Sequence, residues 1–468
     1  MALSLDESVI DAPLLAAARD IASRVRAAGG RALLVGGAVR DALLGGVRVK
    51  DVDLEVFGLE PHALKTLLAE RYPFEPCGVS FGVLKLKGFD IDVALPRRES
   101  KRGEGHRAFE IYSDPTLSVA EAARRRDFTI NAIYYDVLAH AIEDPYDGVA
   151  DLEKRLLRHV SPQFVEDPLR VLRGMQFVAR FALKPAPETI AICQGIGLEG
   201  LASERLFDEW KKFILKGRDM SAGLEFLRAT GWVRFFPELN AIIGCEQDPH
   251  WHPEGDVWEH TKLCCDFFAK TRVGDENEDL IVGLAVLCHD FGKPLTTAYD
   301  PDAQRIRSIG HDEAGVAPTK SFLRRLTNEE RLLKDVPPLV AAHMKPFAFW
   351  KSHAGDAAIR RLALKVGRLD RLIRVSRADD EGRLATSVAT SARGQDLDWL
   401  AEAAHRLAVA DAAPKPILQG RDLIAMGLKP SPQFGVWLKE AFDAQLDGAF
   451  SDLDGARAFF VRQHCNEA

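Results

Sequence analysis

The 468-residue sequence lacks several features that would assign it to a specialised class of protein. None of its 7 cysteines are in CxxC spacing, and their odd number is typical of reduced intracellular thiols and not of a disulfide framework. No run approaches the roughly 18 apolar residues of a membrane span. The N-terminus also lacks the basic start and apolar core of a signal peptide. We therefore expect a cytoplasmic protein without a membrane partner.

An excess of positive charge is also missing, because the formal net charge is -7. Any nucleic-acid binding must then come from local basic patches and not from an overall positive field. The sequence has no internal repeat and no long low-complexity segment. With 47% hydrophobic and 28% charged residues it is typical of globular proteins. Its length predicts about three or four domains.

The early segment 33–54 contains the first chemical signal. An apolar strand breaks at Gly36-Gly37 into a short helix, and the next strand carries Asp51 and Asp53. Alternate residues of a strand point to the same face, so the two carboxylates project together. The free backbone N–H groups at the glycine pair suit an anion. Phosphate beside paired carboxylates indicates metal-assisted phosphoryl chemistry.

A third carboxylate is expected beside this pair. Glu55 falls on the same strand face, but a later strand in segment 83–95 carries Asp90 and Asp92 on one face. Mg²⁺ takes oxygen ligands and usually only a few carboxylates besides substrate phosphates. Acids on half-buried strands are commonly just solvated. Two neighbouring strands with paired acids after a glycine turn favour a metal site, with Asp90 or Asp92 as the third ligand.

Basic segments follow the strands. Residues 97–107 are polar, basic and interrupted by glycine, which predicts a mobile loop that contacts triphosphate or RNA, or is simply solvated. Residues 124–126 are three arginines that run into a mixed segment ending at Ala132. Ahead of both, residues 12–28 have helical periodicity and predict a helix packed on the sheet.

A helix is predicted from Pro168, because acids before a proline mark a helix start. One stripe at helical spacing is predicted core: Val171, Leu172, Met175, Val178 and Ala182. A second stripe holds Asp167, Arg170, Gly174 and Phe177.

Asp167 and Arg170 allow two interpretations. As an i, i+3 pair they would form a surface ion pair worth about 0.2–0.5 kcal/mol. Facing a metal site, they would instead read a base, since the carboxylate accepts from the exocyclic amine of cytosine or adenine while the guanidinium donates to the ring nitrogen. A wrong base would leave a buried polar group unpaired, at about 1–3 kcal/mol.

Four of these segments occur along the chain in the order 36–41, 51–53, 125–132 and 166–173. They resemble, in the same order, the motifs of class II tRNA nucleotidyltransferases (CCA-adding enzymes) and bacterial poly(A) polymerases, across roughly the first half of the chain. The resemblance implies a Mg²⁺-dependent head with Asp51, Asp53 and Asp92 as catalytic carboxylates. Segment 203–211 resembles the next motif, in a helical neck. The nucleotide-binding residues implied are Gly36, Gly37, Arg40, Arg126, Asp127, Asn131, Asp167, Arg170 and Arg173.

The later half carries separated histidines and acids. A lone histidine on such helices is more often a core or surface residue. Taken in their order along the chain, these histidines and acids resemble the ligand set of the HD phosphohydrolase domain. In that domain one or two divalent ions, either a transition metal or Mg²⁺, activate water. Its spread over about 120 residues fits a bundle whose helices each give a ligand. The ligands implied are His260, His289, Asp290 and Asp379, with His311 and His343 as further candidates.

After a polar linker at residues 411–416, segment 417–450 predicts two helices broken at residues 427–432. The second has an amphipathic face made by Trp437, Leu438, Phe442, Leu446 and Phe450.

The sequence thus predicts an α+β protein: a nucleotidyltransferase head with a mixed β-sheet (residues 1–150), then all-helical regions. These are a neck for nucleotide selection and RNA binding (151–240), an HD domain (241–410) and a C-terminal region (411–468). The expected reaction adds CMP and AMP from CTP and ATP to a tRNA 3' end, without a template and with no protein partner evident. The HD domain is expected to act as a phosphatase or 2',3'-cyclic phosphodiesterase. Alternatives are a poly(A) polymerase, a CC- or A-adding enzyme, or an HD phosphohydrolase with a degenerate head.

Overall fold

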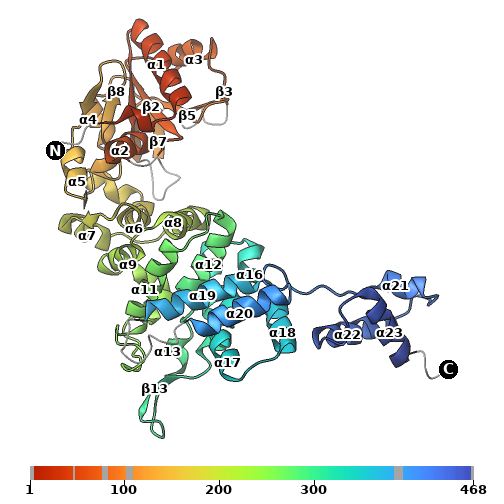
Figure 1. Ribbon diagram of the computed structural model, residues 1–468. Helices are drawn as coiled ribbons and strands as arrows, with labels where there is room; N and C mark the ends of the chain where they lie inside the picture. Colours follow the sequence, from red (N-terminus) through yellow and green to blue (C-terminus); the bar gives the residue numbers. More distant parts are fainter. Residues whose placement is uncertain (1–4, 46–47, 76–82, 102–108, 384–393, 465–468) are drawn as a thin grey trace. The chain divides into compact units, whose positions relative to one another are not determined.

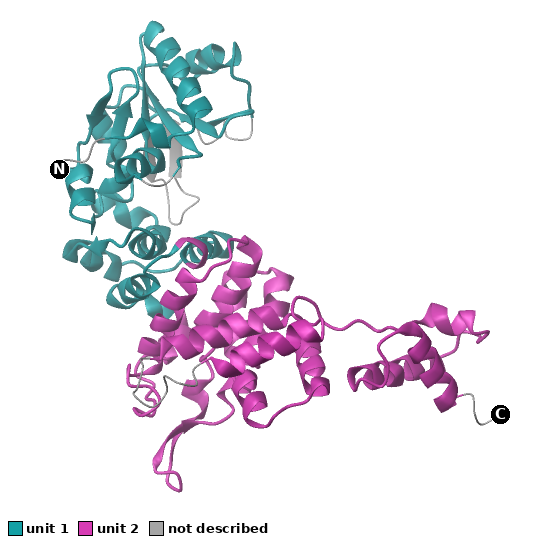
Figure 2. Ribbon diagram, in the orientation of Figure 1, with its two compact units in different colours: residues 1–213, 217–235 teal, residues 214–216, 236–468 magenta. Residues whose placement is uncertain are grey.

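The computed structural model describes residues 5–45, 48–75, 83–101, 109–383 and 394–464. The chain divides into two compact units: residues 1–213 with 217–235, and residues 214–216 with 236–468 (Figure 2). The boundaries of the four predicted domains stay predictions, because this division separates two units only. No described helix combines the length and apolar character needed to cross a bilayer.

The first unit is built on a mixed seven-stranded sheet (Figure 1). Its strand order is β3-β4-β5-β2-β1-β8-β9, in which β2 and β5 run parallel and the other neighbours antiparallel. This confirms the predicted mixed sheet. The predicted first helix is also confirmed, as α1 (Ala12–Ala27), which packs on β1 and β2. The strands are β1 Arg31–Val35, β2 Val52–Phe57, β3 Phe74–Glu75, β4 Val83–Leu86, β5 Ile91–Ala94, β8 Tyr134–Asp136 and β9 Ala141–Glu143.

The turn after β1 depends on glycine. Gly36 has φ 77° and ψ -133°, a conformation that side chains disfavour and glycine adopts freely. Strand β1 therefore turns directly into α2 (Gly37–Leu44), whose buried face includes Val39 and Leu43. Helix α3 (Pro61–Ala69) follows β2 and packs beside α1.

Part of the predicted mobile loop is a strand. Residues Arg97–Lys101 form β6, which pairs antiparallel with β7 (Phe109–Ser113). The prediction for residues 97–101 is therefore wrong, because antiparallel backbone pairing with the next strand outweighs a local composition typical of loops. Residues 102–107 of that prediction lie outside the described part of the chain.

The rest of the first unit is mainly helical, apart from a short parallel pair of β10 (Leu156–Leu157) and β11 (Lys184–Pro185). The predicted core stripe of α6 (Leu169–Phe181) is buried except at Ala182. Ala182 is exposed, because the helix ends at Phe181 and Ala182 turns the chain with φ 50°. The other helices are α4 Val119–Ala123, α5 Gly148–Glu153, α7 Pro187–Gln194, α8 Ser203–Lys216 and α9 Met220–Ala229.

The second unit is a bundle in which α11, α12 and α19 pack on one another. A hairpin of β12 (Thr297–Asp300) and β13 (Arg305–Ser308) interrupts it. Its helices are α10 Pro237–Ala241, α11 Val257–Lys270, α12 Glu276–Cys288, α13 Lys293–Thr296, α14 His311–Ala314, α15 Val316–Leu326, α16 Glu330–Val340, α17 Lys345–Lys351, α18 Asp356–Val366, α19 Leu369–Gly382 and α20 Gln395–Arg406.

The C-terminal part of this unit has its own small core. The two predicted helices are α21 (Gly420–Ala425) and α22 (Gln433–Leu446), and α23 (Leu453–His464) follows them. Of the predicted amphipathic face, Leu446 is buried, and Trp437, Leu438 and Phe450 pack on that core. The core consists of Leu418, Leu423, Phe434, Ala441, Ala456 and Phe460.

Candidate functional site

Two carboxylates meet where β2 and β5 run parallel. The register of these strands pairs Asp53 with Asp92, and β1 places Val35 opposite Asp53. The turn after β1 therefore lies beside them: a Cβ added at Gly36 would lie 3.4 Å from Asp53 Oδ2 and 3.5 Å from Arg126 Nη1. Asp51 immediately precedes β2 and is exposed. The structure thus brings the predicted carboxylates and the glycine turn together.

The charges at this cluster favour a bound cation. Partial burial raises the pKa of the Asp53 carboxyl to about 6. Arg126 opposes this rise, and the Asp92 and Asp51 carboxylates add to it. The side chain still keeps access to solvent. A divalent cation between such carboxylates would relieve their repulsion. Asp90 is exposed before β5, and its backbone carbonyl accepts the Val52 N–H at 2.9 Å. The register therefore favours Asp92 as the third carboxylate.

Glu55 has another role. Its carboxylate is buried and contacts Arg125 at 3.0 Å and Arg126 at 3.2 Å, and it accepts a hydrogen bond from Tyr134 at 2.8 Å. Burial would raise its pKa, but the two guanidinium groups outweigh burial and hold the pKa below its ordinary value. Glu55 therefore anchors the arginines beside the carboxylates and is not free to hold a metal.

Four of the predicted nucleotide-binding residues form one buried network. Asp127 accepts hydrogen bonds from Asn131 Nδ2 at 2.9 Å and from Arg173 Nε at 2.6 Å. Asn131 Oδ1 in turn accepts from Arg40 Nη1 at 2.6 Å. The Arg40 guanidinium also lies over the Phe181 ring, 4.4 Å from its centre. The network links α2, the turn at Thr129–Asn131 and α6.

Asp167 and Arg170 bind different partners. Arg170 donates to the backbone carbonyls of Gln163 at 2.8 Å and Arg125 at 2.6 Å. Asp167 accepts from Arg205 Nη2 on α8 at 2.8 Å. The surface ion pair considered from the spacing is therefore absent between these two described residues. Arg205 belongs to the segment that resembles the neck motif, which is the signal that could have found it.

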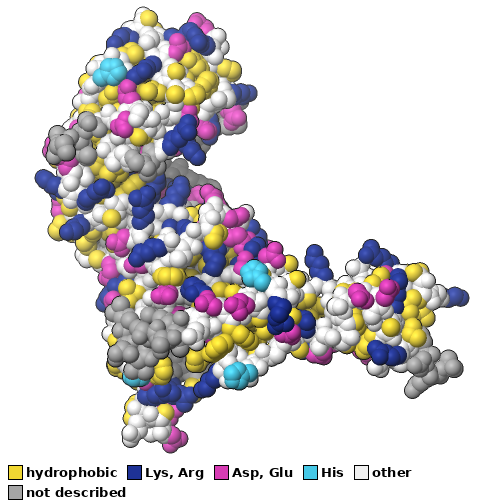
Figure 3. All heavy atoms as spheres, viewed as in Figure 1, with side chains coloured by type: hydrophobic (Ala, Val, Ile, Leu, Met, Phe, Trp, Pro, Cys, Tyr) yellow, Lys and Arg dark blue, Asp and Glu magenta, His cyan; other side chains and the backbone are white. Residues whose placement is uncertain are grey.

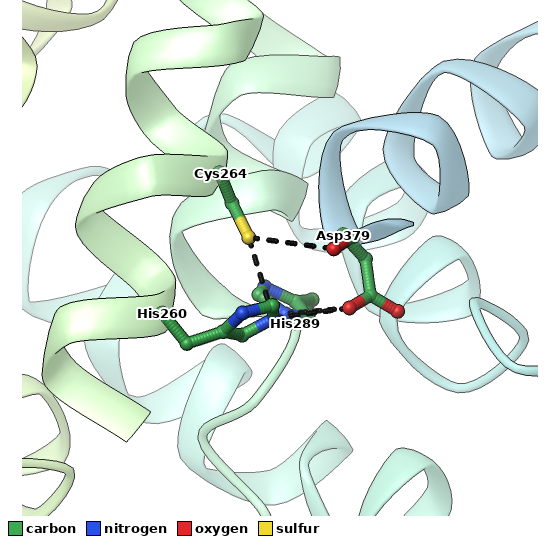
Figure 4. A group of neighbouring side chains, drawn as sticks. All are labelled: His260, Cys264, His289 and Asp379. Atoms are coloured by element: carbon green, nitrogen blue, oxygen red, sulfur yellow. Dashed lines mark hydrogen bonds and ion pairs between the residues drawn. The ribbon is translucent and has the colours of Figure 1, made fainter. Parts of the chain in front are cut away.

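A second cluster lies in the other unit, at the packed helices α11, α12 and α19 (Figure 4). His260 comes from α11, Asp379 from α19, and His289 and Asp290 directly follow α12. Two contacts are short: His260 Nε2 lies 3.0 Å from Asp379 Oδ1, and His289 Nε2 lies 3.2 Å from Asp290 Oδ2. The other oxygen of Asp290 lies 3.4 Å from His311 Nε2. Asp290 therefore faces two groups of histidines.

The ring orientations expose nitrogen lone pairs to the cluster. Nδ1 of His289, of His311 and of His343 each lies 2.7 Å from the carbonyl three residues earlier. A neutral ring then carries its proton on Nδ1, and Nε2 is free to bind a metal. His311 Nε2 and His343 Nε2 face each other at 3.1 Å. Two facing lone pairs need a cation or a proton between them.

Buried polar atoms without hydrogen bonds point to the same conclusion. Among the described residues, His289 Nε2 and both Asp290 oxygens are buried and make no hydrogen bond, and Asp290 Oδ2 forms an ion pair with Lys293 Nζ at 2.7 Å. Hydrogen-bonding capacity left unused in the interior is costly. The donor set of imidazoles and carboxylates fits one or two divalent metals.

The cluster opens onto a pocket of about 800 Å³. Asp290, His311, His343 and Asp379 are among its lining residues. Five basic side chains that could contact a phosphate group also line it, together with further acidic ones: Lys293, Arg305, Arg307, Lys351 and Arg383, with Asp248, Asp312, Asp380 and Asp396.

Three contributors to this cluster were not predicted. Glu254 accepts from His260 at 2.9 Å and orients its ring. Cys264 lies one helical turn after His260, so its i, i+4 spacing is a signal that could have found it. Arg383 contacts both oxygens of Asp379 at 3.1 Å.

Known proteins resemble the chain in sequence and in fold. The poly A polymerase head domain family matches residues 32–158. A multifunctional CCA protein of Xanthomonas campestris pv. campestris (strain B100) is 36% identical over 87% of this chain and 96% of its own length. A multifunctional CCA protein of Xylella fastidiosa (strain M23) is 37% identical over 80% of this chain and 89% of its own length. The two described units also match the Bacillus stearothermophilus CCA-adding enzyme in complex with CTP, with TM-score 0.61 and 20% identity over 98% of this chain and 99% of that one. On this sequence similarity over nearly the whole length, the chain belongs to the CCA-adding class II nucleotidyltransferase family.

Proposed function

We propose that the first unit adds CMP and AMP from CTP and ATP to the 3' end of tRNA without a nucleic-acid template. The observation that carries this proposal is the pairing of Asp53 with Asp92 beside the Gly36 turn. The names of the relatives support it, as does a solved Thermotoga maritima CCA-adding enzyme complexed with tRNA, which shares this fold at TM-score 0.57 and 17% identity over 97% of this chain and 96% of that one.

Asp51, Asp53 and Asp92 would hold Mg²⁺, which when bound supplies a lowered pKa for the attacking 3'-hydroxyl and charge neutralisation for the triphosphate. The chain itself positions the reactants. Backbone N–H groups after Gly36 bind phosphate oxygens, and Arg126, fixed by Glu55, adds positive charge beside Asp53. Positioning of this kind supplies much of the acceleration of phosphoryl transfer.

Nucleotide selection is proposed for Asp167 and Arg170. In the structure, Arg205 and two backbone carbonyls satisfy these groups. A cytosine or adenine edge would replace those partners with an amine donor for Asp167 and a ring-nitrogen acceptor for Arg170. The network of Asp127 and Asn131 holds α6 in place behind them.

The charge distribution fits a local contact with RNA. On the face that Figure 3 shows, basic and acidic side chains of the described residues are interspersed, and the formal net charge of the chain is -7. A processive RNA polymerase would need more positive surface. This favours CCA addition over polyadenylation.

The test offers three tRNAs, lacking CCA, ending in C and ending in CC, with labelled CTP, ATP, UTP or GTP. We expect each tRNA to be completed to CCA and to grow no further, with UTP and GTP unused. Asp53→Asn should incorporate no nucleotide, whereas exposed Glu60→Gln should match the wild type. Long A tails would favour the poly(A) alternative, and products that stop at CC or need CC would favour a partial enzyme.

A second activity is proposed for the other unit: hydrolysis of a 3'-phosphate or 2',3'-cyclic phosphate at a tRNA end by an HD-type metal centre. His260, His289, Asp290 and Asp379 would hold the metal, with His311 and His343, and the bound metal supplies activated water. The observation behind it is that His289 Nε2 and both Asp290 oxygens are buried without a hydrogen bond among the described residues, and that Asp290 lines a pocket with several basic side chains. The domain boundaries and a cytoplasmic location stay predictions.

Phosphate release from such tRNA ends, measured with Ni²⁺, Mn²⁺ or Mg²⁺ added, tests this activity. We expect release by the wild type and none by His289→Ala. Equal release by both proteins, or none by either, would refute the assignment. Asp53→Asn should hydrolyse normally, which separates the two sites.

A further inference from the structure

Cys264 lies among the proposed metal ligands of the second unit. It follows His260 by four residues on α11, so both side chains leave the helix on the same face. Its Sγ lies 3.4 Å from His260 Nε2. Two ligands on one metal, with bonds of about 2.0–2.1 Å to nitrogen and about 2.3 Å to sulfur, lie roughly 3.1 to 3.6 Å apart at tetrahedral or right angles. The observed separation is that of two ligands of one ion.

The remaining atoms complete a coordination site. One ligand atom from each of His260, Cys264, His289 and Asp379 lies within 4.8 Å of all the others. In Figure 4 the sulfur, the imidazole rings and the carboxylate converge on one space. An independent observation supports a ligand there: His289 Nε2 belongs to the same group, is buried, and makes no hydrogen bond within the described part of the chain. Its contact with Asp290 Oδ2 at 3.2 Å pairs it with a second possible metal ligand.

The opposite helix leaves room for the sulfur. Gly382 on α19 packs directly against Cys264, and a Cβ at Gly382 would overlap Sγ. Because Gly382 has no side chain, the sulfur of Cys264 fits against it, beside the carboxylate of Asp379.

A simple hydrogen bond explains the contacts less well. The Cys264 thiol could donate to His260 Nε2, since Nδ1 of that ring faces Glu254 at 2.9 Å. The same Nε2 also faces the Asp379 carboxylate at 3.0 Å. A thiol proton would take up the single lone pair of that nitrogen, and the nitrogen would then have no hydrogen to donate to the Asp379 oxygen 3.0 Å away. A metal ion at the centre satisfies the nitrogen, the sulfur and the oxygen together.

We propose that Cys264 is a thiolate ligand of this centre, which becomes a mixed imidazole, carboxylate and thiolate site selective for Zn²⁺ or Co²⁺ over Mg²⁺. The inference rests on the second proposed activity, because it needs a metal there. On binding, the thiol gives its proton to solvent as the metal–sulfur bond forms, so no oxidant or reductant is involved. Thiolate ligands favour zinc-like ions, whereas Mg²⁺ prefers oxygen.

The test is Co²⁺ substitution of the full-length protein, read by near-ultraviolet absorption, where cobalt–thiolate bonds give a charge-transfer band. Wild type should show the band. Cys264→Ser should still bind Co²⁺, about tenfold or more weakly, but without the band. The matched control is Cys265→Ser, because Cys265 is the buried neighbour on the same helix and lies outside the ligand group; it should keep the band.

A second measurement needs no variant. X-ray absorption of the Zn²⁺-loaded wild type should show one sulfur neighbour at about 2.3 Å, and this signal should decide the case if Cys264→Ser does not fold. Metal bound without a sulfur signature in the wild type, or a band that survives in Cys264→Ser, would overturn the thiolate and leave the metal centre standing. Failure of the wild type to bind Zn²⁺ or Co²⁺ would contradict the proposed centre itself, and the thiolate with it.

Discussion

The substitution Glu55→Gln tests whether the Glu55 carboxylate pairs with neighbouring arginines or binds the metal. Glu55 lies two residues after Asp53 on β2, so the spacing alone makes it a candidate ligand. Its contacts instead lead to Arg125, Arg126 and Tyr134. Glutamine keeps the shape and can still accept from Tyr134, but it removes the negative charge that both guanidinium groups face. The substitution therefore tests the charge and not the packing.

The expected cost is about 3 kcal/mol. Removing one partner of a buried ion pair costs about 3–5 kcal/mol, because the other charge stays buried. The two arginine side chains here are 19% and 20% exposed, so water compensates part of that loss and the lower end applies. For a unit of this size, a change of about 3 kcal/mol lowers the melting temperature by about 6–12 °C.

Calorimetry of the full-length protein measures the transition of the first unit, and nucleotide incorporation at increasing Mg²⁺ measures the metal requirement. We expect Glu55→Gln to lower the melting temperature, reduce incorporation through the displaced Arg126, and leave the half-saturating Mg²⁺ concentration unchanged. Exposed Glu60→Gln serves as the control and should change neither. An unchanged melting temperature with a higher Mg²⁺ requirement would refute the reasoning and make Glu55 a ligand.

Three further predictions concern the first unit. Asp92→Asn should abolish nucleotide incorporation and Asp90→Asn should not, because the strand register places Asp92 opposite Asp53, whereas Asp90 is exposed before β5; the reverse result would exchange their roles. Gly174→Ala should destabilise the protein by about 1–3 kcal/mol in urea unfolding, because the new Cβ would lie 2.8 Å from a buried phenylalanine ring, whereas Gly195→Ala, with its nearest neighbour at 3.7 Å, should cost much less. Asp136→Asn should cost about 1 kcal/mol at pH 7. Burial would raise the pKa of the Asp136 carboxyl, but backbone N–H bonds and Arg31 hold it below its ordinary value. The stabilisation by the charged Asp136 carboxylate is present above the pKa of this group in the unfolded state. It is lost as the pH falls through the pKa of the group in the folded state, so the melting temperatures of mutant and wild type should converge in acid. A difference in melting temperature that persists in acid would contradict the prediction.

The carboxylates of the head could be predicted because strands impose a simple rule. Side chains alternate between faces, so Asp51 and Asp53 had to project together once the strand was recognised. The choice of Asp92 needed more, because the parallel register of β2 and β5 brings together residues that are distant in sequence. The strand pattern alone left Asp90 open, and the family resemblance was what chose Asp92 in the sequence.

The contacts of Asp167 and Arg170 needed the structure. Helical spacing gives the neighbours of a side chain on its own helix, but Arg205 comes from another helix and the carbonyl of Arg125 from a turn. The resemblance to the neck motif marked the segment of Arg205 without pairing it with Asp167. Strand β6 was missed for another reason: its polar, basic composition is typical of a loop, but its backbone pairs with β7, the next strand along the chain.

The two proposed sites differ in the chemistry of their ligands, and this difference has a consequence for metal use. The head offers carboxylate oxygens only, from Asp51, Asp53 and Asp92, which suit Mg²⁺ together with triphosphate oxygens. The second cluster offers imidazoles and carboxylates, with the Cys264 thiolate proposed in addition, and such donors suit zinc-like ions. A chelator that removes transition metals but binds Mg²⁺ weakly should therefore stop phosphate release while nucleotide addition continues. Loss of both activities together would mean that the sites share a metal, against what their donor atoms indicate.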